Sequence, residues 1–413
     1  MELQKIMTQS LFNSVAVISM LLGIWFLFHK KIRNSVIWGA TVTPLASIIG
    51  SGFLVSAPIL ILATGRWASL VMILVVCIAY GLGACLRFNI KNIEPVLGNL
   101  VTYPWLNRIE AISRPCLGIA YVISVAFYLK LLSAFALRGL GLDNLIYEKS
   151  ITTLILFFIG IVGKLRGLHS LVFFETYAVN LKLAIIFSII VCFALYNSEL
   201  LTQGTWIIKQ YPNETWWMGC RKVMGMLIII QGFETSRYIG LGFSETIRIK
   251  TMRYAQWISG VIYILFVALA MVVFTDIHQI SETSIIDICR IVAPVLAPML
   301  IIAAIMSQFS AAIADTLGSG GLLVEATHKK ITVNNSYLLI TMLAIVLTWL
   351  TNIYEILTLA SKAFAVYYAF QIVLTLISLE HFKPQKNYLI NRVFYSCLLL
   401  LMLAILTFGI PSG

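Results

Sequence analysis

The sequence predicts an all-α polytopic membrane protein, on the evidence of its composition and of two interruptions within long apolar runs. Of the 413 residues, 60% are hydrophobic and 11% are charged, and the mean hydropathy is +0.95. Soluble domains of this length carry far more charge, so most of the chain is expected to lie in a bilayer. We predict twelve transmembrane helices, with the approximate limits 11–28, 36–64, 68–89, 116–138, 151–163, 171–195, 217–244, 254–275, 291–324, 336–351, 355–379 and 391–410.

The distribution of basic residues predicts how these helices are oriented. The net charge is +12, which in a soluble protein would suggest a nucleic-acid partner. Here the cations gather in loops that all fall on one side of the predicted helices, at 30–33, 87–114, 164–166, 248–253, 329–330 and 383–392. By the positive-inside rule this side is cytoplasmic. We therefore predict a bacterial inner-membrane protein with both termini outside the cytoplasm and no nucleic-acid partner, and a short interfacial helix in the loop 91–114.

Residue types that serve catalysis or metal binding do not form a pattern. The seven cysteines are scattered without a CxxC pair, and the five histidines lie at helix ends or in loops. The sequence contains no HExxH and no GxSxG motif. We predict no metal site, no cofactor and no enzymatic activity.

The first interruption lies at residues 48–53, which read IIGSGF within the predicted helix 36–64. Each of the two glycines, Gly50 and Gly52, costs a helix about 1 kcal/mol relative to alanine. A break within the membrane is tolerated only where the backbone is buried in protein or lines a cavity. Its free N–H groups attract an anion and its free carbonyls a cation. The alternative is a GxG used for close helix packing.

The second interruption lies in the predicted helix 217–244, where residues 230–238 turn polar. Glu234 would place a carboxylate in the middle of the membrane, which marks a functional candidate. The alternative is that Glu234 and Arg237 pair across one helical turn.

The spacing of the two breaks predicts an inverted repeat. Each break opens a set of five predicted helices, and an odd number makes the two sets run through the membrane in opposite senses. We predict discontinuous first and sixth core helices, with an extra helix and loop at 1–34, a first repeat at 35–196, a second at 197–380 and a final helix at 381–413.

Three stretches resemble the amino acid–polyamine–organocation superfamily. Residues 48–53 resemble its IIGSGIF motif, the QGFE of 231–234 resembles the GFE of its sixth core helix, and the TYAVNLKL of 176–183 resembles its fifth. The resemblance implies a five-plus-five inverted-repeat transporter. The segment 244–250 departs from the family, which has a proline-containing segment there, and this leaves the substrate open.

Lys182 lies about 18 Å from the cytoplasmic end of its predicted helix at 1.5 Å per residue. A lysine buried at that depth can exchange protons. In proton-coupled or uncoupled relatives such a lysine occupies the place of a sodium ion, so the resemblance assigns Lys182 to coupling. Ser307 and Ser310 are its expected hydrogen-bond acceptors. The alternative is that Lys182 is a structural tether.

The leading hypothesis is a secondary active transporter for an amino acid or small amine, proton-coupled or uncoupled, with the solute, the lipid bilayer and protons as partners. The solute would lie between the breaks, with Phe233 as a gate. Its carboxylate would meet N–H groups of the first break, and its ammonium would meet carbonyls of both breaks and Glu234. The expected substrate-binding residues are Ile48, Gly50, Ser51, Gly52, Ile230, Gln231, Gly232, Phe233 and Glu234. The alternatives are a sodium-coupled symporter of a related family and a non-transporting sensor; Lys130, Asp315 and Glu355 have no predicted role.

Overall fold

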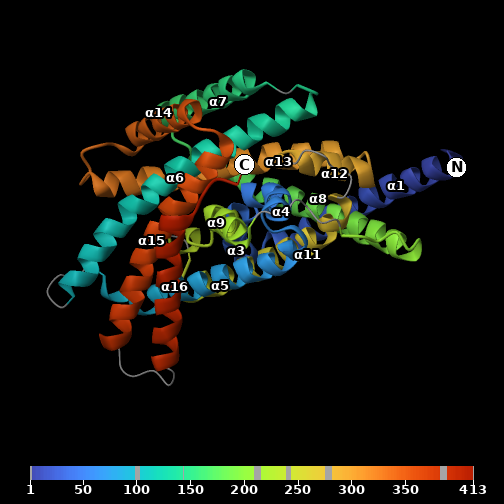
Figure 1. The fold of residues 1–413 in the computed structure, drawn as a ribbon. Coiled ribbons are helices and arrows are strands. Elements are labelled where there is room, and N and C mark those ends of the chain that lie inside the picture. The colour runs from blue at the N-terminus through green and yellow to red at the C-terminus, as the bar shows by residue number, and fades with distance from the viewer. Residues whose placement is uncertain are drawn as a thin grey trace.

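The computed structural model describes residues 2–97, 103–142, 144–208, 215–238, 243–274, 281–381 and 388–412, and this part of the chain contains helices and turns but no strand (Figure 1). By length and composition, ten of the helical stretches described could cross a membrane. The helices are α1 (Glu2–Leu27), α2 (Lys30–Arg33), α3 (Val36–Ile48), α4 (Ser51–Thr64), η1 (Gly65–Trp67), α5 (Ala68–Asn92), η2 (Glu94–Val96), α6 (Pro104–Gly139), α7 (Leu145–Arg166), α8 (His169–Thr202), α9 (Trp216–Gly225), η3 (Leu227–Ile230), α10 (Thr235–Tyr238), α11 (Glu245–Val273), α12 (Ser284–Val292), α13 (Leu296–Ala326), α14 (Val333–Leu350), α15 (Ile353–His381) and α16 (Tyr388–Phe408).

The interruption predicted at 48–53 is present between α3 and α4. Helix α3 ends at Ile48, and α4 starts at Ser51 after Gly50, whose backbone (φ −75°, ψ −124°) is outside the helical region. The Gly50 N–H donates to the Ser47 carbonyl at 3.2 Å, which closes the last turn of α3. The single apolar run of the sequence is therefore two helices joined by a two-residue break.

The interruption predicted at 230–238 is present as well. Helix α9 ends at Gly225, the 3₁₀ turn η3 follows, and residues 231–234 are non-helical, with a turn at 233–234, before the one-turn helix α10 begins at Thr235. Gly232 has φ +122°, a conformation that side chains rarely tolerate. Glycine at this position therefore permits the break.

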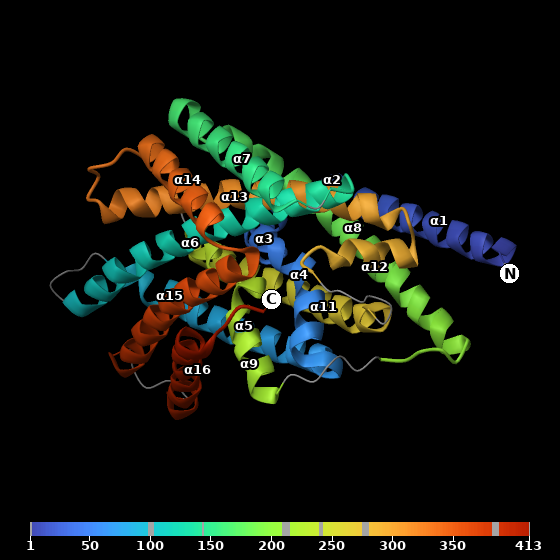
Figure 2. The same cartoon turned by 45° about the horizontal axis from the view of Figure 1, so that its top comes forward.

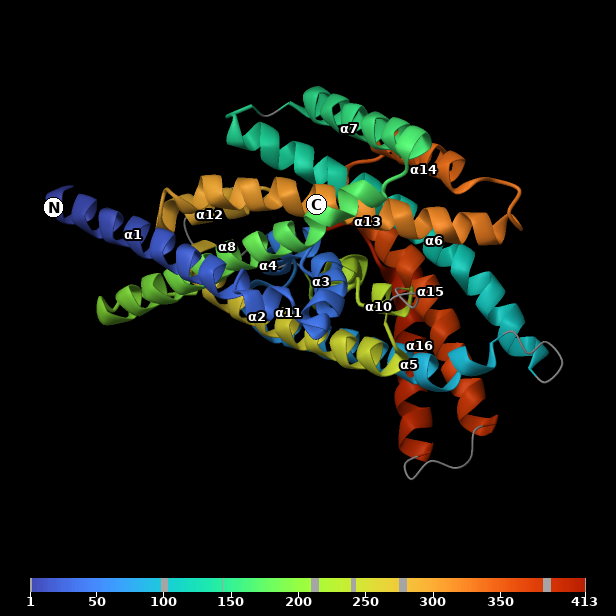
Figure 3. The same ribbon diagram turned by 180° about the vertical axis from the view of Figure 1, so that it is seen from behind.

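Helices that have the same place in the two predicted sets of five helices pack against one another. Helix α5 packs on α11, α6 on α13, and α7 on α14. The α7–α14 pair forms the upper layer in Figures 1 and 2. Figure 3 shows α1 running beside α8, away from the centre where α3, α4 and α10 lie. The two breaks thus lie in the interior, enclosed by the longer helices.

Three expectations about the helices differ from the structure. The predicted helix 291–324 joins two elements, because α12 ends at Val292 and α13 begins at Leu296. Ala293 is extended (φ −152°, ψ 120°), as the residue before a proline generally is. The separate interfacial helix expected in 91–114 is not found among the described residues, since η2 is a single turn and α6 runs unbroken from Pro104; residues 98–102 lie outside the described part. Helix α8 also continues past position 196 to Thr202.

Candidate functional site

Lys182 joins three helices at the level of the first break. Its ammonium donates to the Ala46 carbonyl of α3 at 3.2 Å and to the Ser307 hydroxyl of α13 at 2.9 Å. The Lys182 side chain is 4% exposed, and Ser307 is buried with it. The contact predicted between these two residues is therefore present, whereas the Ala46 carbonyl was not anticipated. Ser310 lies one turn further along α13 and is half-buried.

A small cavity lies beside the Lys182 side chain. Its volume is about 10 Å³, and Gly50, Phe53 and Ser307 line it with Lys182. This is close to the smallest space that holds one water molecule, about 10–15 Å³. Residues of the first break and Lys182 therefore line the same cavity.

The two breaks are in direct backbone contact. A Cβ atom added to Gly52 would overlap the Ile229 carbonyl and lie 2.6 Å from the Ile229 Cα. A Cβ atom added to Gly232 would lie 2.7 Å from the Ile48 nitrogen. Both glycines are needed because main chain meets main chain, so the structure is closed between the breaks.

Tyr263 of α11 bridges the two breaks, and sequence reasoning missed it. Its hydroxyl lies 2.8 Å from the Ile48 carbonyl and 2.7 Å from the Ile229 carbonyl. The Ile48 carbonyl is the last of α3, and the Ile229 carbonyl belongs to the η3 turn. Because a hydroxyl carries one proton, it satisfies one of the two carbonyls at a time. The Ile48 carbonyl, predicted to meet a solute ammonium, here accepts from Tyr263.

Changing Tyr263 to phenylalanine is expected to destabilise the closed arrangement. It removes the one donor that the two buried carbonyls share, at about 1–3 kcal/mol for an unsatisfied buried acceptor. We expect a lower melting temperature and slower transport. The control is Tyr337→Phe in α14, since the Tyr337 ring is buried and its hydroxyl bonds to no residue of the described chain. Equal melting temperatures for the two variants would contradict the bridging role.

The second break carries a buried carboxylate. Oε2 of Glu234 accepts from the Tyr368 hydroxyl at 2.8 Å and from the Gly232 N–H at 2.9 Å. Oε1 of Glu234 and both amide atoms of Gln231 have no hydrogen-bond partner among the described residues. Phe233 stacks on the Tyr368 ring with centroids 5.6 Å apart. The break therefore presents donors and acceptors that a polar solute could satisfy.

The remaining predicted substrate residues surround the same contact. Ile48 and Ile230 are buried, and Gly50 uses its N–H within α3. The Ser51 side chain lies outside the described part of the chain. The structure thus brings both breaks together, in a conformation with no room between them for a solute.

An ion-pair cluster lies at one end of this site and consists of Glu94, Glu110, Arg237 and Arg248. Arg248 binds Glu94 through both nitrogens, at 2.6 and 3.2 Å, and donates to the Arg237 carbonyl at 2.8 Å. Arg237 reaches Glu94 at 3.4 Å and Glu110 at 3.3 Å. Arg237 therefore pairs with carboxylates of η2 and α6, and the alternative that it pairs with Glu234 is wrong among the residues described.

Removing one charge of this ion-pair cluster is expected to cost more than removing a surface charge. Glu110→Gln removes the more deeply buried of the two carboxylates that pair with Arg237 and leaves it with Glu94; the change also removes one partner of Arg114. Breaking a buried pair outright costs about 3–5 kcal/mol, which is the upper limit for this change. The control is Glu325→Gln, which removes the 58% exposed partner of Arg114, worth about 0–1 kcal/mol. Melting temperatures would show the difference, and equal shifts would contradict it.

The charged residues without a predicted role make local contacts. Lys130 donates to the Thr351 carbonyl at 2.7 Å, and Glu355 accepts from the Asn352 N–H at 2.7 Å. Asp315 is buried in α13, within electrostatic range of Tyr128. No group of three His, Cys, Asp or Glu residues in the described chain could hold a metal ion.

This geometry defines a class of protein: a helical membrane carrier with two interrupted helices in contact at its centre. The profile of a family described as "APC superfamily transporter" matches residues 30–409. The chain belongs to this superfamily. An uncharacterized protein of Aquifex aeolicus (strain VF5) is 39% identical over 402 residues, which cover 95% of this chain and 97% of the relative.

Two solved structures of similar fold are distant in sequence. A Na⁺-coupled sialic acid symporter in a substrate-bound outward-open state aligns with TM-score 0.58 and 14% identity, over 96% of each chain. A variant of the Eremococcus coleocola manganese transporter aligns with TM-score 0.51 and 13% identity, over 91% of this chain and 87% of that one. At such identities the likeness concerns the fold alone. Together with the family, it makes the chain an integral membrane transporter.

Proposed function

We propose that the protein is a secondary active transporter for an amino acid or related small amine, proton-coupled or uncoupled through Lys182. The observation that carries the proposal is the Lys182 ammonium, which lies between the end of the broken helix α3 and α13. A change of charge there alters one hydrogen bond to α3 and one to α13. Its protonation is therefore tied to the position of the first break.

The substrate class follows from the second break. An ammonium or another N–H donor would satisfy the free oxygen of Glu234 and the amide oxygen of Gln231. The solute would enter when the backbone contact between Gly52 and Ile229 separates, and Phe233 would cover it. The role of each residue here is part of the proposal.

The proposal extends to the topology. Twelve crossings arranged as five-plus-five inverted repeats with one extra helix at the start are supported by the packing of α5 on α11, α6 on α13 and α7 on α14. Both termini would lie outside the cytoplasm of a bacterial inner membrane. The basic loops at 30–33 and 248–253 support this orientation.

Sodium coupling is the second candidate, and the fold of the Na⁺-coupled sialic acid symporter favours it. The charge of Lys182 opposes it. A sodium ion 4 Å from an ammonium would be repelled by about 4 kcal/mol at an effective dielectric constant of 20. The proposal therefore ranks protons above sodium.

A ligand screen followed by uptake would test the proposal. The purified protein would be heated with amino acids, polyamines and nucleobases, and solutes that raise the melting temperature would be assayed in proteoliposomes. We expect stabilisation by an amino acid or amine, with uptake that needs no sodium. Uptake that depends on a sodium gradient would favour the second candidate, and stabilisation by nucleobases alone would reject the substrate class.

A further inference from the structure

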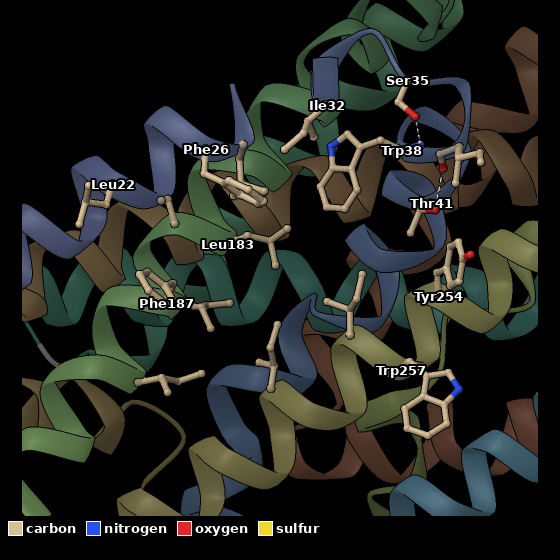
Figure 4. A pocket seen from close by; sticks show the side chains of 18 of the residues that line it. Leu22, Phe26, Ile32, Ser35, Trp38, Thr41, Leu183, Phe187, Tyr254 and Trp257 are labelled. Carbon is tan, nitrogen blue, oxygen red and sulfur yellow. Dashed lines mark hydrogen bonds between the residues drawn. The ribbon is translucent and has the colours of Figure 1, made fainter. Parts of the chain in front are cut away.

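A side groove of about 950 Å³ lies between α1, α3, α8 and α11, apart from the breaks. Its walls are almost entirely apolar. Figure 4 shows Leu22 and Phe26 of α1, Leu183 and Phe187 of α8, and Trp257 of α11 around one opening. Leu183 is buried at the floor, whereas Leu22, Phe26, Phe187 and Trp257 are 48–59% exposed at the sides.

Several polar groups along the groove are already bonded to their own wall. The Ser35 hydroxyl accepts from the Trp38 N–H at 3.3 Å, and the Thr41 hydroxyl donates to the Ile37 carbonyl at 2.7 Å. The Trp38 indole donates to the Asn180 amide oxygen at 3.2 Å. Because these groups already have hydrogen-bond partners within the protein, the part of a ligand that lies along the groove must be apolar.

One end of the side groove is cationic. Lys31 lines it, whereas Lys30 and Arg33 belong to the same exposed helical turn, α2, without lining the groove. On the opposite wall, Lys250 lies 5.7 Å from the ring of Tyr254, which also lines the groove. The residues that line the groove include no carboxylate. Positive charge therefore stands at this end without acidic residues of the lining to offset it.

The length of the side groove matches one leaflet. From Tyr254 to Leu265 the α11 wall extends about 16 Å at 1.5 Å per residue, which is about half of a 30 Å hydrocarbon core. Trp38 follows Lys31 by seven residues, and Tyr254 and Trp257 follow Lys250 by four and seven. Amphipathic aromatic rings of this kind are enriched at membrane interfaces. The groove therefore has a charged end that suits the membrane interface, and the rest of it is lined by apolar side chains.

We propose that the side groove binds an anionic phospholipid, with its phosphate at Lys31, attracted also by the nearby charges of Lys30 and Arg33, and its acyl chains along α8 and α11. Basic pockets between transmembrane helices on the cytoplasmic side recognise such headgroups. Ile186 lines both this groove and the small cavity beside Lys182. The lipid thus supports the wall that α3 and α8 share, and α3 is one half of the first broken helix.

Native mass spectrometry of the purified full chain would test this site. The protein would be titrated with phosphatidylglycerol and with phosphatidylcholine of identical acyl chains. We expect one phosphatidylglycerol to bind more tightly. The variant Lys30→Gln/Lys31→Gln/Arg33→Gln should lose at least tenfold in affinity, because each cation near the headgroup is worth about fivefold.

A matched variant controls for net charge. Lys164→Gln/Lys329→Gln/Lys330→Gln removes three exposed cations of the same predicted face, away from the side groove, and should leave the affinity unchanged. Ile258→Trp, which fills the groove, should weaken binding of both lipids in protein that still melts cooperatively.

Three outcomes would overturn the proposal. The first is equal affinity for the two lipids, and the second is an equal loss of phosphatidylglycerol affinity in the two charge variants. The third is a bound polypeptide, or a second copy of the chain, that remains with the purified protein and is lost in Ile258→Trp. Because binding is read without transport, a failed transport proposal leaves this test valid.

Discussion

Replacing Lys182 with alanine is expected to abolish gradient-driven uptake while the protein still folds. The change removes the donor to the Ala46 carbonyl and the Ser307 hydroxyl, at about 1–3 kcal/mol for an acceptor left unsatisfied in the interior. That is a fraction of the 5–15 kcal/mol by which proteins are typically stable. Transport loses more, because the group proposed to carry the coupling charge is gone.

A second buried lysine gives the matched control. Lys130 is 1% exposed and donates to the Thr351 carbonyl, away from both breaks. Lys130→Ala should lower the melting temperature to a similar extent and retain coupled uptake. Uptake by both variants would be measured in proteoliposomes with an imposed pH gradient, over a range of pH. Normal, pH-independent uptake by Lys182→Ala would contradict the coupling role.

A methyl group at Gly52 is expected to stop transport altogether. The added Cβ would overlap the Ile229 carbonyl and lie 2.6 Å from the Ile229 Cα. Both are main-chain atoms, so no change of side-chain rotamer relieves the overlap. The breaks would have to move apart, and the closed state would be lost; overpacking of this kind typically costs about 1–3 kcal/mol.

Gly39→Ala is the control for this change. Gly39 lies in the same broken helix, α3, and a Cβ there meets nothing within 4 Å. Alanine should stabilise the helix by about 0.5–1 kcal/mol and leave uptake unchanged. Melting temperature and uptake of the two variants would be compared, and equal uptake by both would show that the backbone contact is not required.

The breaks could be predicted because local chemistry marks them. Two glycines in an apolar run, and a glycine followed by a carboxylate in another, are departures from helix chemistry that are visible within a few residues. The link between Lys182 and Ser307 was predicted through the family resemblance. The Ala46 carbonyl could not be predicted as an acceptor, because every residue has a main-chain carbonyl and the sequence does not show which one is free.

The features that were missed depend on contacts between distant segments. Tyr263 is one aromatic residue in an apolar run, and nothing nearby indicates that its hydroxyl meets carbonyls of two other elements. Glu94 and Arg248 lie in predicted loops, and their ion pair could not be predicted because the two residues are 154 positions apart in the sequence. The helix α12 was missed, because its residues 284–290 fall in the loop that the sequence predicts before 291.

The contact of Gly52 with Ile229 also bears on speed and leakage. Side chains rotate within picoseconds to nanoseconds, so a barrier made of one side chain admits brief openings. Here main chain blocks main chain, and only displacement of a whole helix, on the microsecond to millisecond scale, can separate it. Such a barrier sets a ceiling on turnover and keeps stray ions from crossing between cycles.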